Sequence, residues 1–375
     1  MKILFTYEYP FHKSGYGGGQ QIIRDLSKSL TKLGHEVIIS CLGSDELKLN
    51  EIDNPVRYEF QYEYKVGIRS FLFASLGSIR LINKCKPDFI LSFSSESAIL
   101  SLYCKLKNIP FYIYIAAPYL PVFNIYKFKM YLKNIRFHLP LFLQYIGCYF
   151  AKKIFTISDF ILIQALDNWK IENKKIQTLG CAISEIVINH QPQINDQNRF
   201  IKIATTGRLM YSQKPINILA KCLSQLKNIS YEWHIIGTGK DLDNFRIELN
   251  KLGIEKYTIL HSTLSTPQIC KLYDSIDIVI LPSNNESFFI TAYEAISLNK
   301  ILITNKVALL DKIFANYNSI IFSDDVSVEA FAESINKAIK LLNEKNIKTD
   351  LKNASEFVKN NFNWEKISNK LLQNI

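Results

Sequence analysis

The chain has 375 residues, of which 48% are hydrophobic, and it carries a formal net charge of +11. One ordinary hydrophobic core does not serve a chain of this length, so two domains are expected, and the apolar content is enough for both. The seven cysteines are odd in number and form no CxxC pair, which argues against a disulfide scaffold or a zinc site and favours the reducing cytoplasm.

The N-terminal segment predicts a strand, a glycine-rich loop, a helix and a second strand. Residues 2–6 form the first strand, 15–19 the loop and 22–33 the helix with its apolar stripe. The glycine spacing is not GxGxxG, and the second strand does not end in an acid that could hold a ribose, so a nicotinamide or flavin cofactor is not expected. The loop either brings N–H groups to a phosphate or sugar or is a merely flexible turn. Glu8 follows too soon for the apolar core of a signal peptide.

Three further apolar runs, 88–93, 111–115 and 153–157, predict buried parallel strands of the same domain. Glu96 is the only acid near their ends, and it can face a ligand cleft as an acceptor-side contact. The alternative for Glu96 is an ordinary carboxylate in the first turn of a helix.

Between Glu96 and Asp159 the chain has no acidic residue, although eight lysines and arginines fall there among many aromatic side chains. Such a mixture suits the surface of an anionic bilayer, because each basic side chain near the surface contributes ~1 kcal/mol to the free energy of membrane binding. The sequence therefore predicts a peripheral protein on the inner face of the cytoplasmic membrane; the alternative is a solvated basic surface over an aromatic core. The longest uncharged run, 108–126, contains three prolines and is a poor membrane span. No nucleic-acid partner is expected, because no recognised binding module accompanies the charge.

A polar stretch at 190–199 predicts the linker between the two domains. We expect a Rossmann-like acceptor domain at 1–190 and a Rossmann-like donor domain at 200–355, the latter with six apolar runs that predict parallel strands. The final residues, 356–375, predict a helix that crosses back to the first domain.

Two cations follow the first predicted strand of the donor domain. Arg208 stands directly after Gly207, and Lys214 comes six residues later. Their charges suit a diphosphate, because the arginine fork can bind two oxygens at once. The alternative is a pair of surface cations.

A pair of glutamates follows a later strand of the same domain. Glu286 lies in the loop after the apolar run 278–281, and Glu294 lies in a helix that is expected to begin near Phe289 or Ile290. Ligands of open α/β sheets bind at the carboxyl ends of the strands, and the free N–H groups of a helix start suit a phosphate. Two carboxylates nearby suit the hydroxyls of a sugar and a ribose, so the combined pattern predicts a site for a nucleoside diphosphate sugar. The alternative is two solvated glutamates on an ordinary helix.

The segment LPSNNESFFITAYEAISLNKILIT, with seven residues between Glu286 and Glu294, resembles the paired-glutamate signature of family four of the retaining glycosyltransferases. Other short motifs resemble the same family in their order and spacing: Gly207-Arg208-Leu209 with Lys214, IIGTG at 235–239, Gly18-Gly19 before a helix, GHEV at 34–37 and NWEK at 363–366. The resemblance touches both domains and nearly the whole length. It implies the GT-B fold, in which two Rossmann-like α/β domains have parallel sheets that face each other across a cleft.

The resemblance also implies a role for each matching residue. Arg208 and Lys214 hold the donor diphosphate and stabilise the charge on the leaving nucleotide. Glu294 binds ribose hydroxyls, and Glu286 contacts the hydroxyls of the transferred sugar. Further donor contacts come from the loops and the helix start: Gly18, Gly19, Gly207, Gly237, Ser287, Phe288, Phe289 and Ile290. Such enzymes retain the anomeric configuration and need no metal or cofactor. Because the leaving phosphate serves as the base, no protein nucleophile is required either.

Three positions depart from the family pattern. Ser287 and Phe289 stand where glycine is usual, so the sugar pocket is expected to be narrower or differently shaped. Ala116 stands where the family has a histidine that assists at the donor sugar. Its replacement predicts a lowered rate, a substitute such as His12 or Tyr119, or an inactive copy. The alternative for His12 is an ordinary loop histidine.

The sequence thus predicts a retaining, metal-independent glycosyltransferase of the hexosyltransferase type. It moves a sugar from a nucleoside diphosphate donor to a lipid-linked or polysaccharide acceptor in cell-envelope glycan synthesis. One alternative is a nucleotide-sugar epimerase of the same fold, for which the first domain offers Glu96 and His12 as acid and base; another is a degenerate subunit that binds donor without turnover. Asp241 and Asp243 imitate the DxD metal motif of the other glycosyltransferase fold, but they open a predicted helix, so helix capping is the expected role.

Overall fold

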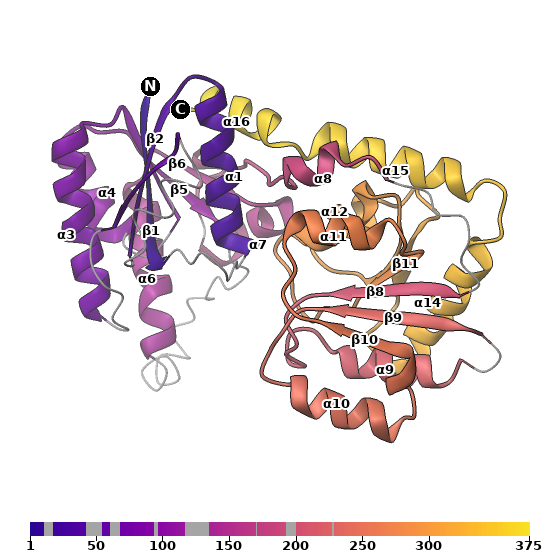
Figure 1. Cartoon of the computed structure of the whole chain (residues 1–375). Helices are drawn as coiled ribbons and strands as arrows, with labels where there is room; N and C mark the ends of the chain where they lie inside the picture. Colours follow the sequence, from indigo (N-terminus) through magenta and orange to yellow (C-terminus); the bar gives the residue numbers. More distant parts are fainter. Residues whose placement is uncertain are drawn as a thin grey trace. The chain divides into compact units, whose positions relative to one another are not determined.

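A computed structural model gives the fold of the chain (Figure 1). It describes residues 1–10, 18–42, 55–60, 68–93, 97–116, 135–169, 171–192, 200–226 and 229–375. The chain divides into two compact units, Met1–Ala182 together with Trp364–Ile375, and Ile183–Asn363. Each unit is built around one parallel sheet, so the predicted α/β class is confirmed.

The sheet of the first unit has its strands in the order β3-β2-β1-β4-β5-β6-β7, and all neighbours run parallel. The strands are β1 (Lys2–Pro10), β2 (Glu36–Leu42), β3 (Arg57–Phe60), β4 (Phe89–Ser92), β5 (Phe111–Ile115), β6 (Lys153–Thr156) and β7 (Ile176–Thr178). Both β4 and β5 are buried along their whole length, which explains why their sequences are continuous apolar runs without polar alternation.

Six α-helices belong to the described part of this unit: α1 (Gly18–Lys32), α3 (Ile68–Cys85), α4 (Ser97–Leu106), α6 (Ile135–Phe150), α7 (Asp159–Trp169) and α16 (Trp364–Leu372). The predicted apolar stripe of α1 is buried from Ile22 to Leu30, with Ile23 and Leu26 inaccessible to solvent, whereas Leu33 follows the helix and is 37% exposed. The C-terminal helix α16 packs on α1, where the hydroxyls of Ser368 and Ser29 lie 2.8 Å apart. None of the described helices is long and apolar enough to cross a membrane.

The sheet of the second unit has the order β10-β9-β8-β11-β12-β13, again all parallel. Its strands are β8 (Ile201–Thr206), β9 (Tyr231–Ile236), β10 (Thr258–His261), β11 (Ile278–Leu281), β12 (Ile301–Asn305) and β13 (Ile320–Ser323). The first strand, β8, lies between β9 and β11, so the chain reverses its direction across the sheet beside β8. Open α/β sheets bind ligands at such a switch point, outside the carboxyl ends of the strands.

The α-helices of the second unit are α8 (Glu185–Asn189), α9 (Ile216–Ser224), α10 (Leu242–Lys251), α11 (Thr266–Tyr273), α12 (Ile290–Ser297), α13 (Leu310–Ile313), α14 (Val328–Leu341) and α15 (Ile347–Asn361). On the face covered by α9, α10 and α14, the fully buried Trp233 meets the ring of Phe245 edge-on with centroids 5.8 Å apart. The indole N–H of Trp233 donates to the Thr205 hydroxyl at 3.0 Å. This core fixes β8 and β9 beneath the loops that follow them.

The first unit ends at Ala182, earlier than the expected boundary at residue 190. Helix α8 packs against α11 and α12, and His190, which follows it, pairs with Asp274 at 2.7 Å between Nε2 and Oδ1. These contacts attach the segment after Ala182 to the second unit. Of the predicted linker, residues 193–199 lie outside the described part of the chain.

The return to the first unit begins at Trp364, later than the expected residue 356. Helix α15 still packs on α12, where the Ser355 hydroxyl donates to the carbonyl of Ser297 at 2.7 Å. The chain leaves the helical conformation at Phe362, two residues before the first unit resumes at Trp364.

Candidate functional site

Most of the predicted donor residues lie at the switch point of the second sheet, on the loops that follow β8 and β11. The two loops are joined through Asn284, whose backbone N–H donates to the carbonyl of Gln213 at 2.9 Å and whose side chain donates to the carbonyl of Ser212 at 3.0 Å. Because β8 and β11 are neighbours in the sheet, residues that are about seventy positions apart in the chain meet here.

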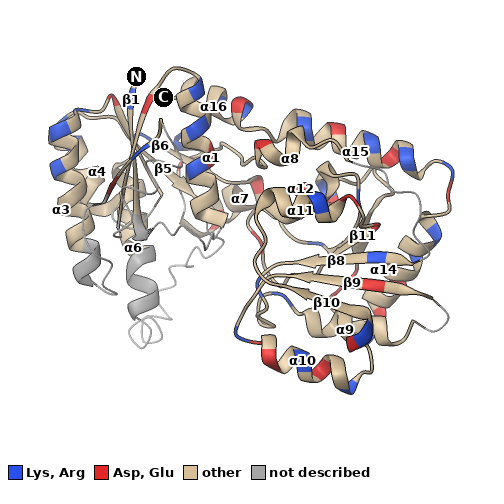
Figure 2. Ribbon diagram, in the orientation of Figure 1, with Lys and Arg blue, Asp and Glu red and all other residues tan. Residues whose placement is uncertain are grey.

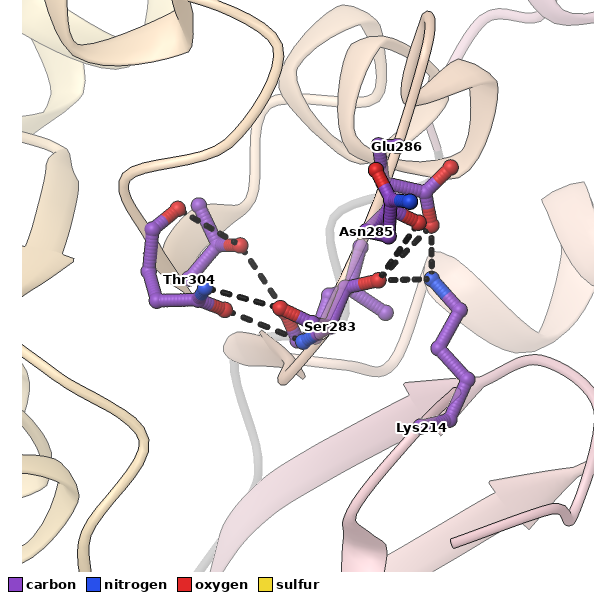
Figure 3. Close-up of polar contacts among 7 residues, drawn as sticks. Lys214, Ser283, Asn285, Glu286 and Thr304 are labelled. Carbon is purple, nitrogen blue, oxygen red and sulfur yellow. Dashed lines mark hydrogen bonds and ion pairs between the residues drawn. The ribbon is translucent and has the colours of Figure 1, made fainter. Parts of the chain in front are cut away.

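Lys214 and Glu286 form an ion pair at the centre of this site (Figure 3). The Lys214 ammonium also donates to the Ser283 hydroxyl at 3.1 Å, and that hydroxyl donates to the same Glu286 oxygen, Oε1, at 2.9 Å. The third neighbour of the ammonium is the ring of Phe289, whose centroid lies 3.8 Å from Nζ. The Lys214 and Glu286 side chains are only 16% and 19% exposed, so both charges are largely removed from water.

Burial sets the protonation behaviour of this lysine. It lowers the pKa of Lys214, and the positive charge of Arg208 lowers it further, while the Glu286 carboxylate raises it without restoring the ordinary value. The burial of a cation is energetically unfavourable, and the Lys214 ammonium is held in place by a carboxylate, a hydroxyl and an aromatic face together.

Asn305, the last residue of β12, holds Ser283 in place. Its N–H donates to Asn305 Oδ1 at 3.0 Å, and Asn305 Nδ2 donates back to the Ser283 carbonyl at 2.8 Å. Next to this pair, the Thr304 hydroxyl donates to the carbonyl of Leu281 at 2.8 Å, as Figure 3 shows. The motif-based prediction missed both Ser283 and Asn305. The available signal was their position, because each is a polar residue at or just after the end of a buried strand.

Arg208 projects from the end of β8 and is exposed. Within the described residues its guanidinium forms no ion pair, in contrast to Lys214. The residue before it, Gly207, has φ +152°, and Gly237 at the end of β9 has φ +140°. A Cβ atom on Gly237 would lie 2.0 Å from the Gly207 carbonyl oxygen, so the two loops approach each other as closely as glycine allows.

Helix α12 begins at Ile290, as predicted. The side chains of Phe288 and Phe289 before it are buried, and the Phe288 ring stacks on Tyr293 with centroids 4.3 Å apart. No acceptor for the backbone N–H groups of Phe288 and Phe289 is found among the described residues. The loop is thus anchored by aromatic packing, and these two donors remain available to a ligand.

Glu294 is half-buried in α12 and influences groups on α11. Burial raises the pKa of the Cys270 thiol to about 11, and the charge of Glu294 adds to that rise. Burial also raises the pKa of Tyr273, whose hydroxyl lies 2.7 Å from the Thr206 hydroxyl at the end of β8; Glu294 contributes there too. The second glutamate therefore lies on the side of the site nearest α11 and the end of β8.

The remaining predicted residues belong to the first unit or fall outside the described residues. Gly18 and Gly19 open α1, and Gly19 faces the Tyr7 hydroxyl. Ala116 follows β5 and is half-buried. The three acceptor-side candidates lie outside the part of the chain that the structure describes: His12, Glu96 and Tyr119.

The role predicted for Asp241 needs correction. It occupies the N-cap position of α10, but its carboxylate makes no capping hydrogen bond to that helix. Oδ2 instead accepts from the backbone N–H of Tyr211 at 2.8 Å, which ties the loop after β8 to the loop after β9. Asp243 lies in the first turn of α10, where a carboxylate is favourable.

One prediction arises directly from the ion pair. Replacing Glu286 with glutamine removes the carboxylate that raises the pKa of Lys214, whereas burial and Arg208 continue to lower it. We expect the pKa of Lys214 to fall further, which nuclear magnetic resonance of the reductively ¹³C-methylated lysine would measure. Asp324→Asn is the control, because it removes the exposed partner of Lys306 and leaves the site untouched. An unchanged or higher pKa of Lys214 in Glu286→Gln would contradict the ion pair.

Comparison with known proteins extends this description to the whole chain. The model of Glycosyltransferase Family 4 matches residues 16–185, and the model of Glycosyl transferases group 1 matches residues 188–364. An uncharacterized glycosyltransferase of Methanocaldococcus jannaschii is 26% identical over 231 residues, and a second one from that organism is 24% identical over 182 residues. These matches cover 59% and 46% of this chain, which spans 60% and 46% of the lengths of the two curated relatives.

Several solved structures share the fold over nearly the full length. A glycosyltransferase from Rickettsia africae has a TM-score of 0.78 at 19% identity, with 99% of this chain and 97% of that chain covered. A lipopolysaccharide outer core galactosyltransferase, WaaB, has a TM-score of 0.68 at 17% identity with both chains fully covered. Anabaena HepE in complex with UDP-glucose has a TM-score of 0.75 at 15% identity, covering 100% and 99%. At such low identities these likenesses show the fold alone, and the GT-B fold predicted from the sequence is confirmed.

Proposed function

We propose that the protein transfers a sugar from a nucleoside diphosphate donor to a glycan or lipid-linked acceptor, because glycosyltransferase family models match both halves of the chain and the whole chain has the GT-B fold. The observation that carries this proposal is the meeting of Lys214 and Glu286 beside Arg208, at the carboxyl ends of two adjacent parallel strands. Cations, a carboxylate and unused N–H groups in one crevice match the parts of a nucleoside diphosphate sugar.

Each group has a task in the proposed reaction. Arg208 binds the diphosphate through its two-pronged fork, and the N–H groups of Phe288 and Phe289 add donors at the helix start. Glu294 binds the ribose hydroxyls. These contacts neutralise the charge that develops on the leaving nucleotide as its bond to the sugar breaks.

The ion pair defines how Glu286 can meet the sugar. Its Oε1 already accepts from Lys214 and Ser283, while Oε2 has no hydrogen-bond partner among the described residues. We therefore assign Oε2 to a hydroxyl of the transferred sugar. Lys214 then serves twice, since it orients this carboxylate and adds positive charge next to the diphosphate.

Retention of the anomeric configuration is also part of the proposal. The acceptor hydroxyl attacks the face that the leaving phosphate vacates, and a phosphate oxygen takes its proton. No protein nucleophile and no metal or other cofactor is required. The neighbour HepE, which was crystallised with UDP-glucose, favours UDP as the first nucleotide to test.

The acceptor is proposed to be an envelope glycan or its lipid-linked precursor. One structural neighbour acts on the outer core of lipopolysaccharide, and the basic, acid-free stretch before Asp159 suits an anionic membrane surface. We therefore place the protein peripherally on the inner face of the cytoplasmic membrane, on the side where nucleotide sugars are made.

Incubation with a panel of nucleotide sugars and acceptor lipids tests the proposal. Release of free nucleotide with formation of a glycosylated acceptor is the expected result. Epimerised sugar without nucleotide release would instead identify an epimerase. Donor binding without any product would favour a second candidate, a degenerate donor-binding subunit, for which Ala116 at the end of β5 is the observation in favour.

A further inference from the structure

Three of the six described α-helices of the first unit contain no acidic residue. They are α3, α4 and α6, whereas α1, α7 and α16 of the same unit each carry at least one aspartate or glutamate. The acid-free region therefore extends beyond the stretch that follows Glu96 and includes a helix from before it. In Figure 2 the ribbon of the described part of α3 has blue segments for Lys and Arg and no red segment for Asp or Glu.

The three helices lie side by side as one layer. The Tyr103 hydroxyl of α4 donates to Asn83 Oδ1 of α3 at 2.7 Å, and the Lys105 ammonium of α4 lies 5.1 Å from the ring centroid of Phe150 in α6. Helices α4 and α6 approach closely at Gly147, where an added Cβ would lie 2.3 Å from the Ser97 hydroxyl. We call the outward surface of this layer the α3–α4–α6 face.

Large apolar side chains project from this face. On α3 the buried stripe includes Ala74, Leu81 and Ile82, which leaves Leu72 and Leu76 on the opposite side. The exposed fraction reaches 75% at Leu106 and 71% at Tyr149. Among the residues of the three helices whose burial is described, the large exposed apolar ones are Leu72, Phe73, Leu76, Leu102, Leu106, Phe142 and Tyr149.

Basic side chains accompany these apolar ones. Arg80 and Lys84 are exposed on α3, and Lys105 and Lys107 are exposed at the end of α4. Since the layer has no carboxylate, nothing on its helices repels a negatively charged surface. A protein partner whose surface carries both charges would gain little binding energy from a face whose charges are all positive. An anionic bilayer, in contrast, offers acyl chains to the leucines and phosphates to the lysines.

We propose that the α3–α4–α6 face is the membrane-docking surface of the protein and that it lies flat on an anionic bilayer. The exposed leucines and Tyr149 enter the interfacial layer, and the four cations remain among the lipid headgroups. This inference rests on the proposed membrane location and specifies which surface makes the contact. It adds to the sequence-based expectation, because α3 was not part of the predicted basic and aromatic stretch.

A matched pair of double variants tests the proposal on the full chain. Leu76→Glu with Leu106→Glu places two carboxylates on the face, at positions that are 51% and 75% exposed. Ile186→Glu with Ile247→Glu makes the same chemical change in the second unit, at positions that are 49% and 55% exposed. Co-sedimentation with vesicles of phosphatidylglycerol and phosphatidylcholine measures binding, and circular dichroism verifies that both variants fold.

We expect the face variant to bind anionic vesicles at least tenfold more weakly than wild type, and the control variant to bind like wild type. Binding of wild type should also fall when phosphatidylcholine replaces the anionic lipid. Equal loss in both variants, or none in either, would overturn the assignment of this face. A dimer in sedimentation that only the face variant loses, without vesicle binding by wild type, would make a second copy the occupant instead.

The same proteins separate this inference from the proposed function. UDP affinity, measured by calorimetry in the absence of vesicles, should be equal in wild type and in both variants, since the substituted positions lie outside the donor loops. Vesicle binding that follows the prediction in a protein that binds no nucleotide would preserve the docking surface and refute the donor site. Nucleotide binding without any vesicle binding would preserve the donor site and refute the docking surface.

Discussion

Replacing Arg208 with alanine is expected to weaken UDP binding by roughly 10- to 150-fold, because a hydrogen bond to a charged group is worth about 1.5–3 kcal/mol. The Arg208 side chain is exposed at the end of β8, and within the described residues it forms no ion pair that it would have to give up. Its two-pronged fork is therefore free to bind a diphosphate at little cost. Titration calorimetry of the wild type and variant with UDP measures the difference.

Two further variants sharpen this experiment. Arg208→Lys keeps the charge but loses the fork, so its affinity should lie between those of wild type and alanine. Arg246→Ala is the matched control, because Arg246 is an exposed arginine on α10 that pairs with Asp243 away from the proposed site. If Arg208→Ala and Arg246→Ala bound UDP equally well, the diphosphate site would have to be placed elsewhere.

Glu294→Ala examines the other end of the same ligand. Loss of a half-buried carboxylate that binds ribose hydroxyls should lower the affinity for UDP but not the affinity for inorganic pyrophosphate, which lacks the ribose. Arg208→Ala should weaken both. If both variants bound UDP with unchanged affinity in calorimetry, the donor-site assignment would be wrong.

The local parts of the donor site could be predicted because they follow from short-range patterns. The run Ile278–Leu281 is apolar at every position, as a strand covered on both faces requires, and α12 begins at Ile290 within the predicted limits. The pairing of Lys214 with Glu286 was not predictable at this level of detail. It depends on β8 and β11 being neighbours in the sheet, and strand order is a long-range property of the fold.

The basic and aromatic stretch shows what composition cannot predict. Its composition indicates a membrane surface, yet Tyr145 of α6 is half-buried with its ring edge-on to Trp169 at 5.7 Å between centroids, whereas Phe142 of the same helix is exposed. Composition alone cannot separate an aromatic residue in the core from one on the surface. The structure makes that separation and adds Leu72 and Leu76 of α3, which lie far upstream in the sequence.

The unit boundaries were displaced for a related reason. Polar composition predicted a linker near residue 190, but composition does not show that the short helix α8 before it already belongs to the second unit. His190, which follows α8, pairs with Asp274 at 2.7 Å, and no local sequence pattern predicts this contact.

The largest effect on stability is expected from Gly237→Ala. The backbone at Gly237 has φ +140°, a region that is essentially restricted to glycine and costs other residues about 1–3 kcal/mol. In addition, the new Cβ would lie 2.0 Å from the carbonyl oxygen of Gly207, which is a backbone atom and cannot rotate away. We expect the second unit to lose about 3 kcal/mol or more of its free energy of unfolding, which lowers the melting temperature of its transition by about 6–12 °C.

Gly253→Ala separates the two contributions to that loss. Gly253 also has a positive φ, +68°, but an added Cβ there meets nothing within 4 Å, so only the backbone strain of about 1 kcal/mol applies. In calorimetry, the melting temperature of Gly237→Ala should therefore be well below that of Gly253→Ala. Equal melting temperatures would mean that the loop carrying Gly207 moves easily to accommodate the new Cβ at position 237. In that case Arg208, the next residue, is not held rigidly, and donor binding would have to order this loop as well as contact it.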